Sequence, residues 1–143
     1  MKTILLFLFS VVMLLFTGCQ SSRQMSSPPS VATGVQPANI YLMRPHRFAG
    51  DGVAPDLYLD GQLISRLASG DYTIFRVSPG SHMIGAKLGD SGFSSQRVEC
   101  EVGKEYFFRV VVGVTPIATV AFNPLPAAGV ERLKAHLNFM PLN

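Results

Sequence analysis

Hydrophobic and polar residues alternate in short runs along most of the chain, and Gly, Pro, Asp or Asn separates one run from the next. Runs of this kind are typical of β-strands, whose successive side chains point to opposite faces. Strands are expected at residues 39–44, 56–60, 62–67, 72–77, 81–88, 97–102, 105–112 and 117–122. Seven or eight short strands with frequent turns predict an all-β fold, an antiparallel β-sandwich.

The pattern is specific enough to predict one hairpin in detail. Asp60-Gly61 lies between two apolar runs, and both residue types tolerate the positive φ of a type I′ turn. A two-residue turn would place Leu59 opposite Gln62 and Leu57 opposite Ile64. Leu57, Leu59 and Ile64 would then share one face of the sheet.

Two later strands differ in how they are expected to be buried. In residues 97–102 the charged side chains Arg97, Glu99 and Glu101 alternate with Val98, Cys100 and Val102. The period of two predicts that the second set points into the core. Residues 105–112 are apolar on both faces, which is typical of a central strand.

The period changes near the end of the chain. After Pro124 and Pro126, apolar side chains recur at Val130, Leu133 and Leu137, which is a helical spacing. A short amphipathic helix is therefore expected over Ala127–Leu137. Packing on its own domain is favoured over membrane-surface binding, because the polar face is not strongly basic.

The first residues have the properties of a signal peptide. Lys2 precedes an apolar run at residues 4–16, which contains only Ser10 as a polar interruption. As a helix this run is about 20 Å long, whereas a bilayer core of about 30 Å needs about 20 residues. The run therefore favours a secretory signal over the alternative, a transmembrane anchor.

The residues that follow resemble the lipobox of bacterial lipoproteins. Small residues precede an obligatory cysteine there, as Thr17 and Gly18 precede Cys19, although Phe16 stands where Leu, Val or Ile is usual. The resemblance implies cleavage between Gly18 and Cys19 and acylation of Cys19. The alternative is an ordinary secretory signal with a chance cysteine. Gln20, in place of Asp, favours the outer membrane facing the periplasm.

The mature chain is expected to consist of a tether and one domain. Residues 19–38 contain the lipidated cysteine and a Ser-, Pro- and Gln-rich linker without apolar periodicity. A free linker of about 18 residues reaches roughly 25 Å. Residues 39–143 form the sandwich with its terminal helix. Cleavage removes Lys2 and leaves two more basic than acidic residues, a small excess that does not indicate a nucleic-acid partner.

Three stretches resemble a known family: Leu57-Tyr58-Leu59-Asp60-Gly61-Gln62, Val77-Ser78-Pro79-Gly80-Ser81-His82 and Val102-Gly103-Lys104-Glu105-Tyr106-Phe107. The opening Ile40-Tyr41 followed by Arg44-Pro45 fits as well. The pattern is similar to uncharacterised bacterial lipoproteins with a β-sandwich related to PEGA-type and transthyretin-like modules. This resemblance covers roughly residues 39–137. It implies a fold and an envelope location, and it provides no catalytic residues.

Few residues suggest catalysis or metal binding. The three histidines lack the close spacing of a zinc site, so no metal or cofactor is expected. Cys100 could act as a nucleophile with His82 as base, but its inward alternation favours a core position. The acidic residues lie mostly at turns, and Gly-Asp-Ser-Gly at 89–92 lacks the strand-to-helix elbow of a serine nucleophile.

The loop Arg44-Pro45-His46-Arg47-Phe48 is the candidate binding site, since Arg and aromatic residues are favoured in recognition surfaces. The favoured interpretation is nevertheless a solvated loop, with Phe48 folded over the open end of the sandwich. The expected function is a membrane-anchored, non-catalytic binding or structural module of the cell envelope. Its partner would be another envelope protein, a glycan or a small ligand. The alternative is an envelope hydrolase whose site is built from loops.

Overall fold

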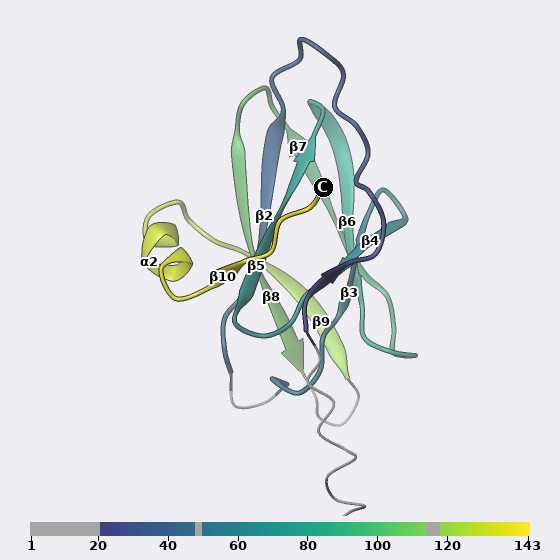
Figure 1. Ribbon diagram of the computed structural model, residues 1–143, viewed down its shortest axis with the longest axis vertical. Coiled ribbons are helices and arrows are strands. Elements are labelled where there is room, and N and C mark those ends of the chain that lie inside the picture. The colour runs from purple at the N-terminus through teal and green to yellow at the C-terminus, as the bar shows by residue number, and fades with distance from the viewer. Residues whose placement is uncertain (1–20, 48–49, 114–117) are drawn as a thin grey trace, which may run out of the picture.

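The computed structural model describes residues 21–47, 50–113 and 118–143, and it shows a β-sandwich of two five-stranded sheets (Figure 1). The first sheet has the order β1 (Arg23–Gln24), β4 (Gln62–Arg66), β3 (Asp56–Leu59), β6 (Gly80–Lys87), β7 (Ser94–Cys100). The second has the order β10 (Asn138–Phe139), β5 (Asp71–Val77), β2 (Ala38–Arg44), β8 (Glu105–Gly113), β9 (Thr119–Pro124). Strands β2 to β9 confirm the eight predicted strands, although residue 117 lies outside the described ranges.

The predicted β-sandwich is confirmed, and most of its strand pairs are antiparallel, but the second sheet is mixed. Strand β2 pairs in parallel with β8, so Tyr41 lies opposite Phe107, and β10 pairs in parallel with β5. Parallel neighbours need a long crossover. Between β2 and β8 the chain builds most of the first sheet, which supplies that crossover.

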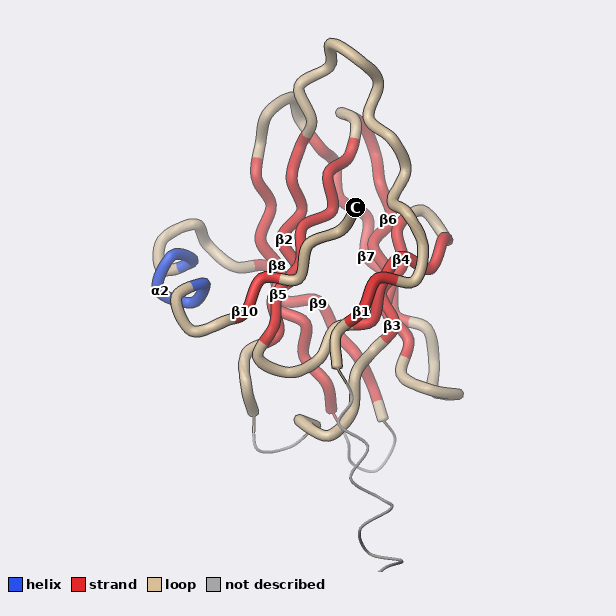
Figure 2. Tube along the Cα trace, in the orientation of Figure 1, coloured by secondary structure: helices blue, strands red, loops and turns tan. Residues whose placement is uncertain are grey.

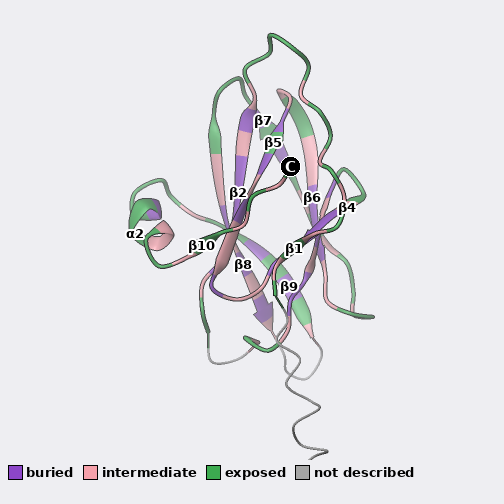
Figure 3. Ribbon diagram, in the orientation of Figure 1, coloured by how far each residue is buried: buried purple, intermediate pink, exposed green. Residues whose placement is uncertain are grey.

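The core lies between the two sheets, whose strands carry most of the buried residues (Figure 3). In most strands the core members recur at every second position. The largest fully buried apolar side chains of the core are those of Phe75, Ile40, Leu42, Leu57, Leu59, Ile64, Leu67 and Ile84. Val98 and Cys100 belong to this core, as the alternation in β7 predicts. Strand β8 lies between β2 and β9, which confirms its interior position. Val102 does not follow the prediction: β7 ends at Cys100, and Val102 is 60% exposed in the turn that follows.

The hairpin at Asp60-Gly61 forms as expected, with one difference in register. Both residues have positive φ, 50° and 82°, and Leu59 lies opposite Gln62. Leu57, however, lies opposite Ser65, because a β-bulge makes Ile64 an extra residue. Ile64 remains fully buried, and its carbonyl oxygen accepts backbone hydrogen bonds from Met25 and Ser26.

The terminal helix is shorter than predicted. Helix α2 (Val130–Lys134) begins after Gly129, whose φ of 96° prevents the helix from starting earlier. It ends before Leu137, because the chain then enters β10 beside β5. The helix packs on the outer face of the second sheet (Figure 2). A second apolar cluster forms there, and its buried members are Tyr41, Met43 and Val130.

The segment before β2 differs most from its prediction as a free linker. Ser22 and β1 lie against the first sheet, where Arg23 pairs with Arg66 and Gln24 with Ser65. The side-chain amide of Gln24 also exchanges two hydrogen bonds with the backbone of Asn143. These contacts are polar, so the lack of apolar periodicity did not predict them. In the described part of the chain, no helix has the length and apolar character to cross a membrane.

Candidate functional site

Arg44 lies inside the protein, which corrects its prediction as part of an exposed binding loop. It is the last residue of β2 and is only 3% exposed. Its guanidinium donates from Nη1 to the carbonyl oxygen of Leu67, at 2.9 Å, and from Nη2 to that of Gly50, at 2.5 Å. Burial lowers the pKa of Arg44, while Asp51 and Asp71 act in the opposite direction. Arg44 therefore joins the end of β2 to the backbone at Gly50 and Leu67.

The rest of the predicted loop is organised by Asp51. The backbone N–H of Arg47 donates to Asp51 Oδ1 at 2.8 Å, and Ser69 Oγ donates to the same oxygen. His46 Nδ1 lies 3.5 Å from Asp51 Oδ2. The hydrogen bond from Ser69 contributes most to the lowered pKa of Asp51, followed by those from Arg47 and His46. His46 and Arg47 are exposed, and Phe48 lies outside the described residues.

Ser69, His46 and Asp51 do not form a catalytic triad. In a triad, the serine and the carboxylate bind different nitrogens of the imidazole. Here Ser69 Oγ lies 3.5 Å from Nδ1, the same nitrogen that faces Asp51, and the serine hydroxyl donates to the carboxylate itself. The cavity at this point measures only about 10 Å³, which is too small for a substrate.

Cys100 and His82 do not form a nucleophile and base. Burial, with the negative charges of Glu99 and Asp60, raises the pKa of Cys100 to about 11, so the thiol stays protonated at neutral pH. Its Sγ contacts the carbonyl oxygen of Val98 at 3.8 Å. His82 Nδ1 lies 2.7 Å from Asp60 Oδ2, and Nε2 lies 2.8 Å from the carbonyl oxygen of Ser78. His82 thus connects two turns. Within the described ranges, no three His, Cys, Asp or Glu side chains gather as metal ligands would.

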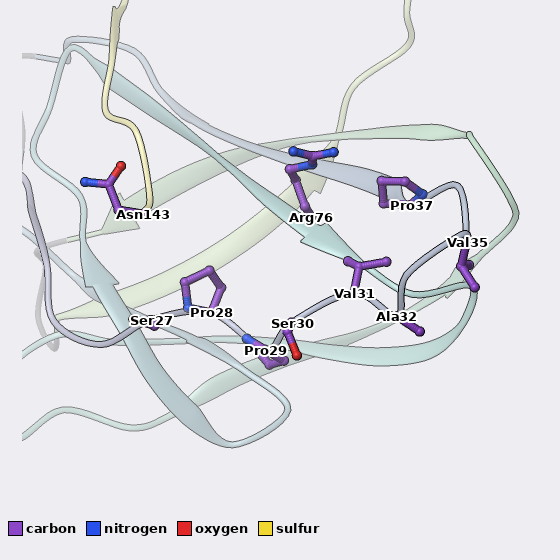
Figure 4. A pocket seen from close by; sticks show the side chains of 10 residues that line it. All are labelled: Ser27, Pro28, Pro29, Ser30, Val31, Ala32, Val35, Pro37, Arg76 and Asn143. Carbon is purple, nitrogen blue, oxygen red and sulfur yellow. The ribbon is translucent and has the colours of Figure 1, made fainter.

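A groove of about 500 Å³ lies between the predicted linker and β5 (Figure 4). This volume is within the usual range of ligand pockets. Its walls are mostly proline and small apolar side chains, and Arg76 supplies the one guanidinium. The lining residues are Ser27, Pro28, Pro29, Ser30, Val31, Ala32, Val35, Pro37, Arg76 and Asn143. The Arg76 side chain is exposed and has no hydrogen-bond or ion-pair partner among the described residues.

Sequence reasoning missed this groove. The composition of residues 20–37 predicts a tether, and no local pattern marks Arg76. The only local signal is the Pro-Pro pair at 28–29, which stiffens the chain without indicating what it lies against. A smaller cavity of about 280 Å³ lies beside α2. It is lined by Arg109, whose Nε is buried without a hydrogen-bond partner among the described residues.

Comparison with known proteins places the chain in a family. No curated protein matches it. A family model described as Protein of unknown function (DUF2846) matches residues 35–123. This range contains Arg44, Arg76 and Cys100, while Cys19 and most of the proline-rich wall of the groove, residues 27–32, precede it. The match agrees with the predicted membership of an uncharacterised family. Because it covers more than half of the chain, the protein belongs to the DUF2846 family.

Proposed function

We propose that the protein is a lipid-anchored envelope lipoprotein whose sandwich is a non-catalytic binding module. Its binding site is the groove between residues 27–37 and Arg76. The ligand class is a small molecule with an apolar body and an anionic group. The observation that carries the proposal is the guanidinium of Arg76, which has no partner among the described residues and lies beside an apolar, proline-rich wall.

The chemistry of the groove favours this ligand class. Proline and valine side chains provide an apolar surface, and prolines lose little freedom when a ligand binds. Guanidinium groups form paired hydrogen bonds with carboxylate, sulfonate or phosphate oxygens. Among the partners considered from the sequence, a small amphiphilic ligand therefore fits better than a neutral glycan. The membrane anchor itself rests on the lipobox around Cys19 and on the signal-like residues before it.

A fluorescent amphiphile tests the groove. The probe 8-anilinonaphthalene-1-sulfonate has an aromatic body and one anionic group. Arg76→Gln should raise its Kd about tenfold, which corresponds to about 1.4 kcal/mol. Arg97→Gln is the matched control, because Arg97 is an exposed arginine on β7 and does not line the groove.

A neutral analogue separates the charge from the apolar contact. N-phenyl-1-naphthylamine lacks the sulfonate, so Arg76→Gln should leave its binding unchanged. Equal binding of the sulfonate probe to the wild type and Arg76→Gln would contradict the proposed role of Arg76. A loss as large in Arg97→Gln would indicate nonspecific charge attraction instead.

A further inference from the structure

The folded domain begins very close to the proposed lipid anchor. Ser22 Oγ donates to Asp71 Oδ2 at 2.5 Å and accepts a hydrogen bond from the backbone N–H of Ala68 at 2.7 Å. Arg23 and Gln24 then pair with β4. Ser22 is therefore held against the turn between β4 and β5, only three positions after Cys19.

This short connection limits the distance between the domain and the membrane. Three residues span at most about 11 Å when fully extended. A free linker over residues 20–37 would have reached roughly 25 Å. The limit of about 11 Å set by the three-residue connection is close to the electrostatic screening length, which is about 8–10 Å near physiological salt. Charged side chains at this end of the domain would then lie within the field of the lipid headgroups.

The candidate loop lies next to this attachment point. Ser22 binds Ala68, and the adjacent Ser69 contacts both His46 and Asp51. The Cβ that an alanine would carry at position 70 would clash with the imidazole of His46, which therefore covers Gly70. These contacts bring the loop that contains His46 and Arg47 to the end of the sandwich where the chain enters the fold.

The groove lies at the other end of the same strands. Arg44 pairs with Asp71 at one end of β2 and β5, and Asn39 pairs with Arg76 at the other. The five residue steps from Asn39 to Arg44 correspond to about 17 Å of strand. Figure 1 shows residues 27–37 rising to the end of the sandwich opposite the N-terminal entry.

We propose that the end of the sandwich formed by His46, Arg47, Asp51 and Ser69 rests on the membrane surface. Its partner is the lipid headgroup layer, and the groove beside Arg76 faces away from the bilayer. This inference rests on the proposed lipid anchor at Cys19. It gives the exposed His46 and Arg47 side chains a position at the headgroups, and it leaves the groove open to ligands in the periplasm.

Headgroup quenching tests this orientation. The full lipoprotein is purified with its acyl chains and inserted into vesicles of phosphatidylethanolamine and phosphatidylglycerol that contain a headgroup nitroxide lipid. A thiol-reactive fluorophore is placed at Arg47→Cys or, as the matched control, at Thr33→Cys, which is exposed in the opposite loop. The fluorophore at position 47 should lose most of its emission, and the one at position 33 should keep most of it.

A spacer variant tests the role of the short connection. Insertion of about ten Gly and Ser residues between Gln20 and Ser21 lengthens the reach well beyond that of the native three residues. Quenching at position 47 should then fall markedly. Equal quenching at positions 33 and 47, or an unchanged signal in the spacer variant, would overturn the orientation. A protein that carries no acyl chain and does not float with the vesicles would contradict the anchor itself and the orientation with it.

Discussion

The guanidinium of Arg44 donates a 2.9 Å hydrogen bond to the carbonyl oxygen of Leu67 and thereby joins the two sheets. Arg44 ends β2 of the second sheet, and Leu67 directly follows β4 of the first. The backbone N–H of Leu67 in turn donates to the carbonyl oxygen of Pro55. One buried side chain thus holds the end of the sandwich together.

Arg44→Ala should destabilise the protein by about 2–4 kcal/mol, because it removes two hydrogen bonds to carbonyl oxygens and leaves a void. Chemical denaturation of the soluble domain measures this change. The control is Arg47→Ala, whose exposed side chain should contribute within about 0.5 kcal/mol. Similar losses for both variants would show that Arg44 has no special structural role.

The Cys100 thiol should react slowly with a polar maleimide in the folded protein and quickly in denaturant, because it is only 5% exposed. Cys100→Ser should cost about 1–3 kcal/mol, since the hydroxyl is buried without an assured partner. Cys100→Ala should cost less, because it introduces no polar group. Rapid labelling of the native protein would contradict the core assignment.

Stability should fall as the pH rises above about 9, with Cys100 as one cause. The pKa of its thiol is raised from 9.0 to about 11 in the folded protein, so the folded state retains a proton that the unfolded state releases. The stability that the protonated Cys100 thiol contributes to the folded state is fully present below pH 9 and is lost progressively between pH 9 and 11. Melting temperatures measured across this range should decline less steeply for Cys100→Ala. Parallel curves for the two proteins would rule out this linkage.

Removal of residues 21–26 should lower the stability of the soluble domain by about 1–3 kcal/mol. It removes the pairing of β1 with β4 and the hydrogen bonds of Ser22, each of which contributes about 1 kcal/mol. The comparison is between chains that begin at residue 21 and at residue 27. Identical melting temperatures would restore the simpler view of this segment as a free tether.

Cys19→Ala should abolish acyl labelling and release the protein from the membrane fraction, because the lipobox cysteine is the proposed acylation site. Metabolic labelling with a fatty-acid analogue and fractionation measure the two effects. Cys100→Ala serves as the cysteine control and should remain labelled and membrane-bound. A Cys19→Ala protein that still carries the label would refute the lipoprotein proposal.

The strands and the main turn could be predicted because their signals are local. Alternation in β7 marks Val98 and Cys100 as inward, and this depends only on the period of a strand. Asp60-Gly61 specifies its turn through the φ values that these two residues tolerate. Both features depend on residues that are near neighbours in the chain, so a single sequence is enough to predict them.

The pairing of segments that are distant in the chain has no such local signal and could not be predicted. At the bulge, the carbonyl oxygen of Ile64 accepts backbone hydrogen bonds from Met25 and Ser26, which lie far away along the chain. Backbone hydrogen bonds of this kind leave no pattern in side-chain polarity. The strand β1 was therefore interpreted as linker, and the parallel pairing of β2 with β8 was not predicted.

The candidate site residues show the same difference between local and long-range information. The sequence alone shows that Arg44, His46 and Arg47 stand close together before a turn, and its alternation predicts that Cys100 points inward. The burial of Arg44 against carbonyl oxygens becomes visible in the folded protein, because those oxygens belong to Gly50 and Leu67. The tertiary structure alone brings Arg76 beside the prolines at 28–29, since a groove exists only where segments distant in sequence are held together by folding.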